Sequence, residues 1–459
     1  MSRTSRLNTI LGSRKGAAIF LAIICALLIV LWIPGVGNPV VSDTVLYARL
    51  GQSLWTEWSY AIDSVPYAKH LPLHAFLSYP LVAAFGMRLG MHLSSLLGGF
   101  GVLVLTFLLI RLLVSPVIAV LTTIAVLFHP GFLFMTVVGS ADLLFTTIFL
   151  GLLFALVRGE KAPRWLFVAG VLAGLASITR YNGLPLFLLI PVYVLAERRS
   201  FLQSKWLWGG LFLGGSILGL WFLRNLLVFR NPFFTAYTTE LVAESDGPIR
   251  QLFANVWYYA LPYHNIFALF PFALIGLLVY GKTLPLLIAG MITMWAFTLF
   301  WWVQAMRFAF PGYVPLLAFA TLGLLFLIRR FPSRVLWIPI LIGIATAQGA
   351  SLCLYTYGAC NAWFDRTVGI LPQDMKLSTE GFYTWEQARD FLNGHVPSGA
   401  TVVVGGEIVW NDDIFRRDVR VLAEACPAYR ITQRPEGRDE ILFATEDVPV
   451  TYVTLQRCS

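Results

Sequence analysis

The chain has 459 residues, of which 58% are hydrophobic and 12% are charged, and its formal net charge is +9. Soluble domains carry about a quarter charged residues, so a chain this apolar would not stay dispersed in water, and we exclude a soluble protein. The positive charge does not indicate nucleic-acid binding, because much of it lies in short segments between apolar runs, where basic residues orient a membrane protein.

About eleven apolar runs are candidate transmembrane helices, since about 20 apolar residues are needed to cross a bilayer. The first run follows a basic segment, and no small-residue cleavage site comes after it, so we expect an uncleaved span rather than a signal peptide. The predicted spans are residues 17–35, 92–112, 114–132, 139–157, 164–179, 182–196, 206–229, 263–280, 283–301, 309–328 and 335–357.

The basic residues between these spans fall on one side of the membrane if the chain starts in the cytoplasm. Short basic segments prefer the cytoplasmic side, so their distribution supports both the number of spans and this orientation. The predicted cytoplasmic segments are residues 1–15, 111–115, 158–164, 197–205, 282 and 329–334.

Three longer segments are then expected outside the cytoplasm: residues 36–91, residues 230–262 and the tail 358–459. The tail combines an amphipathic helical pattern at 384–395 with strand patterns at 400–405 and 448–455, which predicts a small α/β domain. An oxidising compartment would allow one disulfide among the three cysteines of this region, Cys360, Cys426 and Cys458.

The first outer segment begins with a predicted surface helix. Ser42 is a candidate N-cap, Asp43 is the first helical residue, and Tyr47 follows one turn later. Three leucines share one face of this helix, which favours a helix lying on the membrane over one crossing it. The alternative reading of Asp43 is a residue that only caps its helix.

A second interfacial helix is predicted at 73–87, and Lys69, His70 and His74 lie at its start. Together with Asp43, they place a carboxylate, a cation and two imidazoles in one loop, which indicates a reaction centre. Lys69 could instead extend its ammonium group to lipid headgroups.

The segments 42–55 (SDTVLYARLGQSLW) and 60–86 (YAIDSVPYAKHLPLHAFLSYPLVAAFG) resemble the first loop of a family of membrane enzymes. These are the dolichyl-phosphate-mannose–protein mannosyltransferase-like enzymes of the GT-C class, which include bacterial aminoarabinose and galacturonic-acid transferases of lipid A. Their pattern is an acidic residue, Tyr-Ala, and then Lys/His-Pro-Pro-Leu-Tyr. Here the last part reads KHLPLH, with Leu71 in place of the first proline and Pro72 retained.

Further segments resemble the family in the same order along most of the chain. They are 129–153, 177–186 (SITRYNGLPL), 223–234 (LRNLLVFRNPFF), 307–318 (RFAFPGYVPLLA) and 386–406. The resemblance implies a GT-C-like helical domain at 1–357, a small extracytoplasmic α/β domain at 358–459, and a bacterial inner membrane as the location.

The resemblance also implies inverting transfer of a sugar from a polyprenyl-phosphate donor to an acceptor hydroxyl or phosphate, with Asp43 as the base. Arg180, Arg224 and Arg307 lie at or near outer span ends, against the usual bias, and guanidinium groups match phosphate. We expect Lys69 and Arg307 to hold the donor phosphate, with Arg180 and His70 beside them. The alternative is that such arginines anchor the protein at the headgroups.

Asp142 lies at the outer end of a span, where ionisable residues are functional or paired. Asp142, and Tyr47 with it, could bind the acceptor, hold a metal or orient Lys69 or Arg180. The alternative for Asp142 is a structural ion pair with an arginine.

A divalent cation is a candidate cofactor, with His70, His74 and His264 as its candidate ligands. These histidines show no ligand spacing, so the alternative is that they are ordinary polar residues. No other cofactor is expected.

Two other classes of protein remain as alternatives to a transferase. A transporter or lipid flippase predicts internal repeats and polar residues in broken helices at mid-membrane, and the sequence shows no repeat. A non-catalytic scaffold explains the tail but not the charged first loop. The expected partners are a polyprenyl-phosphate sugar, a glycolipid or glycan acceptor and membrane lipids, whereas the identity of the sugar and of the acceptor is not encoded in these patterns.

Overall fold

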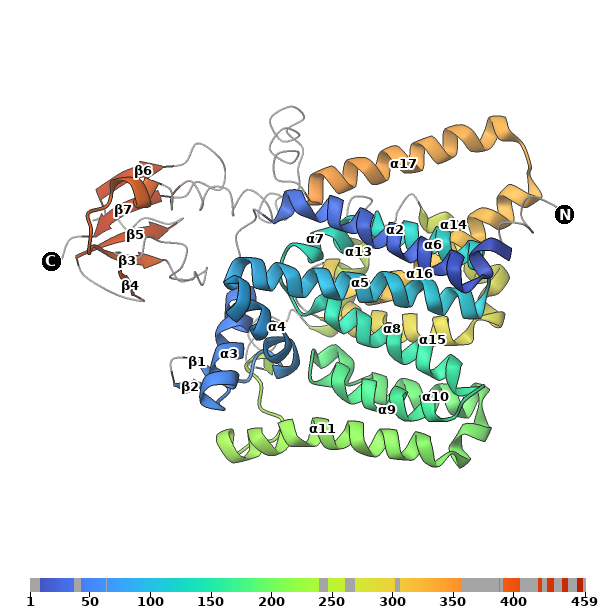
Figure 1. Ribbon diagram of the computed structural model, residues 1–459, viewed down its shortest axis with the longest axis horizontal. Helices are drawn as coiled ribbons and strands as arrows, with labels where there is room; N and C mark the ends of the chain where they lie inside the picture. Colours follow the sequence, from blue (N-terminus) through green and yellow to red (C-terminus); the bar gives the residue numbers. More distant parts are fainter. Residues whose placement is uncertain are drawn as a thin grey trace.

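The computed structural model describes residues 9–36, 43–62, 64–238, 247–260, 269–301, 306–356, 388, 391–404, 420–422, 427–432, 440–444 and 452–456. Long helices form a bundle, and a small sheet lies beyond one end of it (Figure 1). This architecture confirms the predicted fold class, a helical membrane protein with a small sheet domain toward the C-terminus.

Each of the eleven predicted spans overlaps a helix. These helices are α2 (Arg14–Trp32), α5 (Met87–Leu113), α6 (Pro116–Leu127), α8 (Asp142–Gly159), α9 (Arg164–Ser177), α10 (Leu186–Glu197), α11 (Lys205–Phe229), α14 (Phe270–Tyr280), α15 (Pro285–Phe300), α16 (Met306–Arg330) and α17 (Arg334–Thr356). Among the described residues, five helical segments are long and apolar enough to cross a membrane: Arg14–Gly35, α5, α8, α11 and α16. Eleven crossings therefore stay a prediction.

The first outer segment folds into two helices that were both predicted. α3 (Asp43–Glu57) is followed by a short antiparallel pair, β1 (Ala61–Ile62) and β2 (Val65–Pro66), and then by α4 (Pro72–Phe85). α3 runs crosswise to the long helices at the sheet-domain end of the bundle (Figure 1). Gly51 lets the two helices touch, because a Cβ there would lie 2.4 Å from the Ala75 carbonyl oxygen. The predicted cap Ser42 lies outside the described residues.

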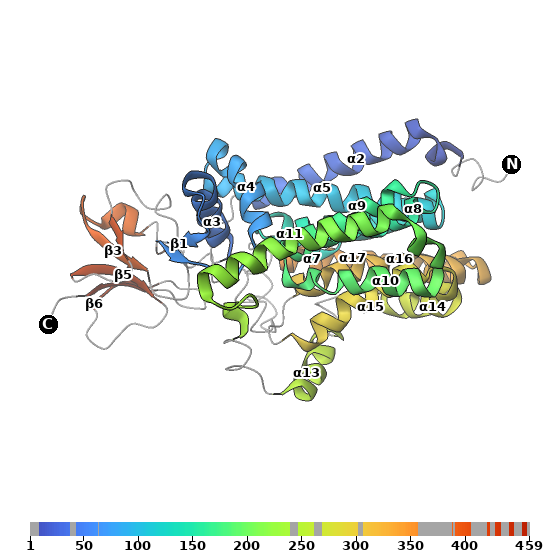
Figure 2. The same ribbon diagram turned by 90° about the horizontal axis from the view of Figure 1, so that it is seen from below.

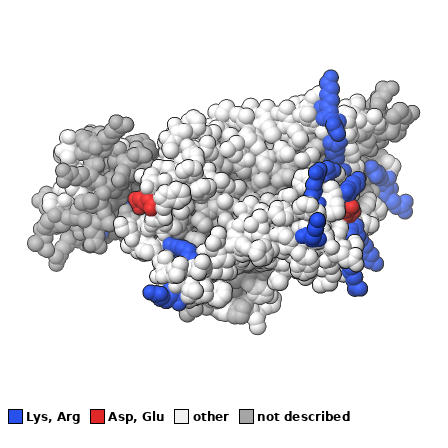
Figure 3. All heavy atoms as spheres, turned by 60° about the horizontal axis from the view of Figure 1, so that its bottom comes forward, with Lys and Arg blue, Asp and Glu red and all other residues white. Residues whose placement is uncertain are grey.

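Lysine and arginine side chains gather at the end of the bundle opposite the sheet domain (Figure 3). The turns after α8 and α10 meet there through an ion pair, in which Arg198 Nε lies 2.8 Å from Glu160 Oε1. The Arg111 guanidinium in the last turn of α5 donates to the Gly12 carbonyl oxygen at the same end. The described parts of the basic segments that were predicted to share one side of the membrane therefore gather at one end of the molecule.

Glycines allow α9 and α11 to pack backbone against backbone. A Cβ at Gly214 would lie 2.2 Å from the Gly170 carbonyl oxygen, and one at Gly174 would lie 2.4 Å from the Gly214 carbonyl oxygen. Small residues of this kind let membrane helices approach closely. The resulting van der Waals contacts stabilise the pair in lipid, where the hydrophobic effect does not drive helices together.

A single added methyl group at this contact should destabilise the protein. We expect Gly214→Ala to lower the free energy of unfolding by about 1–3 kcal/mol, because the added Cβ has no space. Gly215→Ala is the matched control on the same helix, since a Cβ at Gly215 meets nothing within 4 Å and alanine favours a helix over glycine. Thermal unfolding in detergent measures both variants, and equal melting temperatures would contradict the close packing.

α13 (Pro248–Ala260) belongs to the second outer segment and lies at the side of the bundle near α15 (Figure 2). Two of its polar side chains, Gln251 and Asn255, contact the end of α15. Asn255 Nδ2 donates to the carbonyl oxygens of Leu299 and Trp301, at 2.9 Å and 2.6 Å, and Gln251 Nε2 donates to the Trp301 carbonyl oxygen at 3.1 Å. α13 therefore fixes Trp301, the residue that directly follows α15.

The C-terminal sheet has five described strands in the order β4-β3-β5-β7-β6. They are β3 (Thr401–Val404), β4 (Arg420–Leu422), β5 (Ala428–Thr432), β6 (Glu440–Ala444) and β7 (Tyr452–Gln456). β3 pairs in parallel with β4 and β5, and β7 pairs antiparallel with β5 and β6.

Helical residues 391–395 supply Leu392 to a small core with Val402, Ile431 and Val453. The strand predicted at 400–405 is confirmed, as are the described parts of the helix at 384–395 and of the strand at 448–455. Cys360, Cys426 and Cys458 lie outside the described residues, so the disulfide stays a prediction.

Candidate active site

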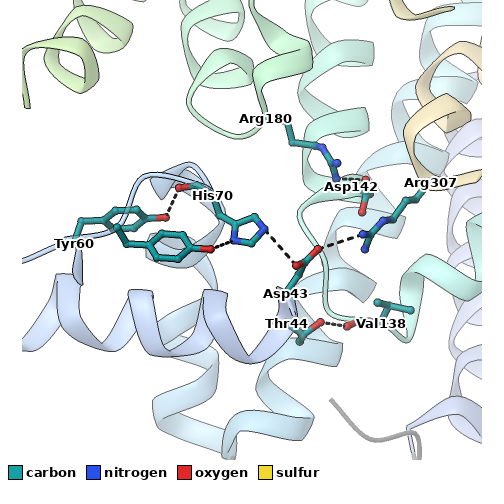
Figure 4. Close-up of polar contacts among 9 residues, drawn as sticks. Asp43, Thr44, Tyr60, His70, Val138, Asp142, Arg180 and Arg307 are labelled. Atoms are coloured by element: carbon teal, nitrogen blue, oxygen red, sulfur yellow. Dashed lines mark hydrogen bonds and ion pairs between the residues drawn. The ribbon is translucent and has the colours of Figure 1, made fainter. Parts of the chain in front are cut away.

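The start of α3 is tied to the turn that precedes α8. Thr44 Oγ1 donates to the Val138 carbonyl oxygen at 2.5 Å, which places Asp43 beside the N-terminus of α8 (Figure 4). The neighbouring Gly139 has a φ of +73°, and a Cβ there would lie 2.6 Å from Thr44 Cγ2. A glycine is therefore required for this turn, both by its backbone conformation and by the closeness of α3.

One cavity brings together side chains from distant parts of the chain. Seven of the residues singled out in the sequence line it: Asp43, Tyr47, Lys69, His70, Asp142, Arg180 and Arg307. They come from α3, the segment before α4, the start of α8, the turn after α9 and the start of α16. Of the reaction centre expected in the first loop, Asp43, Lys69 and His70 line the cavity, together with the further candidates Asp142, Arg180 and Arg307.

Asp43 lies between two nitrogen donors (Figure 4). Its Oδ1 is 3.3 Å from His70 Nε2, and its Oδ2 is 3.2 Å from Arg307 Nη2. Burial alone would raise the pKa of the Asp43 carboxyl, but the hydrogen bond from His70 and the positive charge of Arg307 outweigh burial and hold that pKa well below its usual range. Asp43 is therefore ionised at neutral pH and is a weak base, whose value to a reaction depends on its position.

Asp142 is the first residue of α8 and forms an ion pair with Arg180. The pair is buried, with exposed side-chain fractions of 2% for Asp142 and 15% for Arg180. The Arg180 guanidinium also lies over the Phe308 ring, 4.9 Å from its centroid. The ion pair with an arginine, which was the alternative interpretation of Asp142, is therefore present. It lies in the wall of the cavity.

Aromatic rings form another part of the wall. Lys69 Nζ lies 5.4 Å from the centroid of the Tyr237 ring, which is the geometry of a cation–π contact. Tyr237 in turn packs edge-on against Trp301, at 5.3 Å, and against Tyr181, at 5.9 Å. This side of the cavity therefore combines a cation with apolar ring faces.

Sequence reasoning missed seven polar and aromatic lining residues, which are Ser140, Thr179, Tyr181, Asn182, Tyr237, Trp301 and Phe308. Three of them belong to the SITRYNGLPL segment and one to the RFAFPGYVPLLA segment. Sequence analysis singled out these segments but not these residues. Tyr237 and Trp301 carried no periodic or motif signal.

Arg224 is placed differently from Arg180 and Arg307. Its guanidinium donates to the Tyr60 carbonyl oxygen and to Asn225 Oδ1, both at 2.9 Å, and lies 5.0 Å from the centroid of the Trp221 ring. Arg224 is absent from the residues that line the cavity. Its contacts hold the loop before β1 against α11, which is a structural role.

The candidate metal ligands do not gather in the part of the chain that is described. No group of three His, Cys, Asp or Glu side chains there could hold a metal ion, and His264 lies outside this part. His74 is buried behind Tyr47, with its Nε2 3.2 Å from the Gly139 carbonyl oxygen. Burial lowers the pKa of His74 to about 4, so His74 is neutral, and a divalent cation stays a prediction.

Comparisons with known proteins bear on the fold of the chain. The family model described as dolichyl-phosphate-mannose-protein mannosyltransferase matches residues 72–221. The structure resembles ArnT from Cupriavidus metallidurans bound to undecaprenyl phosphate, with a TM-score of 0.64 and 14% sequence identity over 96% of this chain and 98% of that one. A search of curated protein sequences finds no match.

Two larger membrane proteins resemble the chain over only part of their length. An oligosaccharyltransferase from Archaeoglobus fulgidus has a TM-score of 0.53 and 15% identity, over 83% of this chain and 56% of that one. The arabinofuranosyltransferase AftD from Mycobacteria has a TM-score of 0.51 and 16% identity, over 89% of this chain and 32% of that one. The resemblance to the GT-C class that the sequence indicated is therefore confirmed at the level of the fold.

Proposed function

We propose that this protein of GT-C fold transfers a sugar from a polyprenyl-phosphate donor to an acceptor hydroxyl, with inversion, at the outer face of a bacterial inner membrane. The observation that carries the proposal is the position of Asp43, held between His70 and Arg307 in a cavity that Lys69 also lines. A relative of the same fold has been solved with undecaprenyl phosphate, which supports a donor of this class.

The donor's leaving group is a phosphate, which needs cations more than it needs a proton. Lys69 and Arg307, which both line the cavity, are proposed to bind this phosphate. Arg180 already pairs with Asp142, so it would contribute as part of a fixed ion pair. Asp142 would thereby orient Arg180 toward the phosphate.

Asp43 is proposed to accept the proton of the acceptor hydroxyl. As that oxygen bonds to the anomeric carbon, the bond from this carbon to the phosphate oxygen breaks, and the bonding electrons leave with the polyprenyl phosphate. The proton ends on Asp43. A single displacement of this kind inverts the anomeric centre, and a weak base suffices because it is already in position.

Transfer and donor binding test the proposal together. Purified protein in nanodiscs is given a panel of undecaprenyl-phosphate sugars, neutral, acidic and amino, with mixed bacterial lipids as acceptors, and mass spectrometry follows the products. We expect one donor class to yield a glycosylated acceptor and undecaprenyl phosphate. We expect Lys69→Met to raise the donor Kd by about tenfold or more, because it removes a charge-assisted contact with phosphate.

Lys282→Met is the matched control, because Lys282 is exposed and follows α14 at the basic end of the bundle. A folded wild-type protein that neither transfers sugar nor binds any polyprenyl-phosphate sugar would overturn the proposal and favour transport or lipid flipping. Equal effects of the two lysine variants on donor binding would remove Lys69 from the phosphate site.

A further inference from the structure

His70 is held at both of its ring nitrogens and at its backbone (Figure 4). Nε2 lies 3.3 Å from Asp43 Oδ1, which is an ion-pair distance, and makes no hydrogen bond of regular geometry with any described residue. Nδ1 lies 2.7 Å from the Tyr67 hydroxyl, and the Tyr60 hydroxyl donates to the His70 carbonyl oxygen at 2.9 Å. The imidazole thus links Asp43 to a tyrosine on the other side of the ring.

Aromatic rings enclose the same imidazole. The Tyr67 ring is stacked on it at 5.7 Å, the Tyr47 ring is tilted against it at 4.9 Å, and the Tyr237 ring meets it edge-on at 6.3 Å. The His70 side chain is only 4% exposed. A ring packed on three sides cannot turn toward a ligand in the cavity without displacing its neighbours.

The tautomer of the His70 ring is constrained by this arrangement. In the neutral ring the Tyr67 hydroxyl donates to Nδ1, so the proton is on Nε2 and faces Asp43. In the imidazolium ion Nδ1 donates to Tyr67, and Nε2 again carries a proton toward Asp43. The remaining tautomer would direct a lone pair at an ionised carboxylate, which is repulsive.

We propose that His70, fixed by Tyr67, is the positioning residue of Asp43, holding Oδ1 so that Oδ2 faces the acceptor hydroxyl. This assignment replaces the role in phosphate binding expected from the sequence, and it rests on the proposed transfer reaction. Arg307 can move from Asp43 to the donor phosphate because its side chain is 28% exposed to the cavity. His70 stays on Oδ1, so the carboxylate keeps its orientation when Arg307 leaves Oδ2.

Three variants test the assignment: His70→Ala, His70→Gln and Tyr67→Phe. We expect His70→Ala to lower kcat by about 10- to 100-fold, the range for loss of a hydrogen bond to a charged group, with the donor Kd unchanged. We expect His70→Gln to recover part of this loss, because its amide N–H can reach the position of Nε2. Tyr67→Phe leaves the imidazole in place and should lower kcat less.

The dependence of kcat on pH separates a positioning role from a structural one. Loss of the hydrogen bond raises the pKa of Asp43, and the base acts only when ionised, so the fall in rate on the acid side should move to higher pH in His70→Ala. His395→Ala, in the sheet domain, is the control whose profile should match the wild type. The other charged and titratable groups that line the cavity are unchanged in both variants: Tyr47, Lys69, Asp142, Arg180, Tyr181, Tyr237 and Arg307.

A raised donor Kd with unchanged kcat in His70→Ala would overturn the assignment and place His70 on the phosphate. Unchanged kcat and an unchanged pH profile would overturn it as well. If His70→Ala does not fold, His70→Gln and Tyr67→Phe decide, since both preserve the size of the side chain. Wild-type protein without transfer or donor binding would overturn the proposed function and this inference together, whereas active wild type with an equally active His70→Ala overturns the inference alone.

Discussion

Asp43→Asn is expected to lower the rate of glycosyl transfer by about 10²- to 10⁴-fold, the usual contribution of a positioned general base. Asparagine keeps the shape of the side chain and can still accept a hydrogen bond from His70 Nε2 through its amide oxygen. It cannot take the proton of the acceptor hydroxyl. Donor binding should not weaken, because Arg307, which lies 3.2 Å from Asp43 Oδ2, loses a competing carboxylate and remains available to the phosphate.

Single-turnover transfer and donor Kd, measured on the same nanodisc preparation, check this expectation. Glu57→Gln is the matched control, since it removes a carboxylate from the exposed far end of the same helix. Transfer at the wild-type rate in Asp43→Asn would remove Asp43 as the base and direct attention to Asp142. A large rise in donor Kd would show that Asp43 contributes to binding and not to the proton transfer.

Arg307 links donor binding to the basicity of Asp43. In the structure its positive charge lowers the pKa of the Asp43 carboxyl. A bound phosphate would draw the guanidinium away or share it, so the carboxylate would become a stronger base when the donor is present. Binding of the donor would thus raise the basicity of Asp43, the residue that deprotonates the acceptor. Without donor, Arg307 would keep Asp43 a weak base.

Hydropathy and the sidedness of basic residues were enough to predict a helix at each of the eleven apolar runs and to place the short basic segments on one side, whereas α13 was not predicted. Both signals are local in the sequence, since each span is one apolar run and each turn one short segment. The start of α3 at Asp43 and the start of α4 near Pro72 were predictable for the same reason. The candidates Lys69, Asp142 and Arg180 follow from charges at the outer ends of such segments.

The geometry of the cavity could not be predicted in this way. Arg307 and Asp43 are 264 residues apart in the chain, and only the resemblance to a family, not a pattern within either segment, placed them in one site. Tyr237 and Trp301 carry no motif; their rings meet in the structure, where α13 also holds the Trp301 carbonyl oxygen. Arg224 resembled the other outer arginines in sequence, yet its partner is a backbone carbonyl.

The buried ion pair between Asp142 and Arg180 should be much more sensitive to substitution than an exposed pair. Removing one partner of a buried pair leaves an uncompensated charge, which costs about 3–5 kcal/mol of unfolding free energy. We therefore expect Asp142→Asn and Arg180→Met each to destabilise the protein strongly. The double variant should lose less than the sum, because it leaves no charge behind.

Glu160 and Arg198 provide the matched control, because they join the C-terminal end of α8 to a later turn, as Asp142 and Arg180 do at its N-terminal end, and are also 38 residues apart. Their side chains are 38% and 42% exposed, so a double-mutant cycle on them should give a coupling of about 0–1 kcal/mol. Equal couplings for the two pairs, from denaturant unfolding in detergent, would contradict the burial of the Asp142 pair. A double variant that folds stably and binds donor but transfers no sugar would show that the pair also has a role in catalysis. In such a variant the loss of activity could not be explained by loss of the fold.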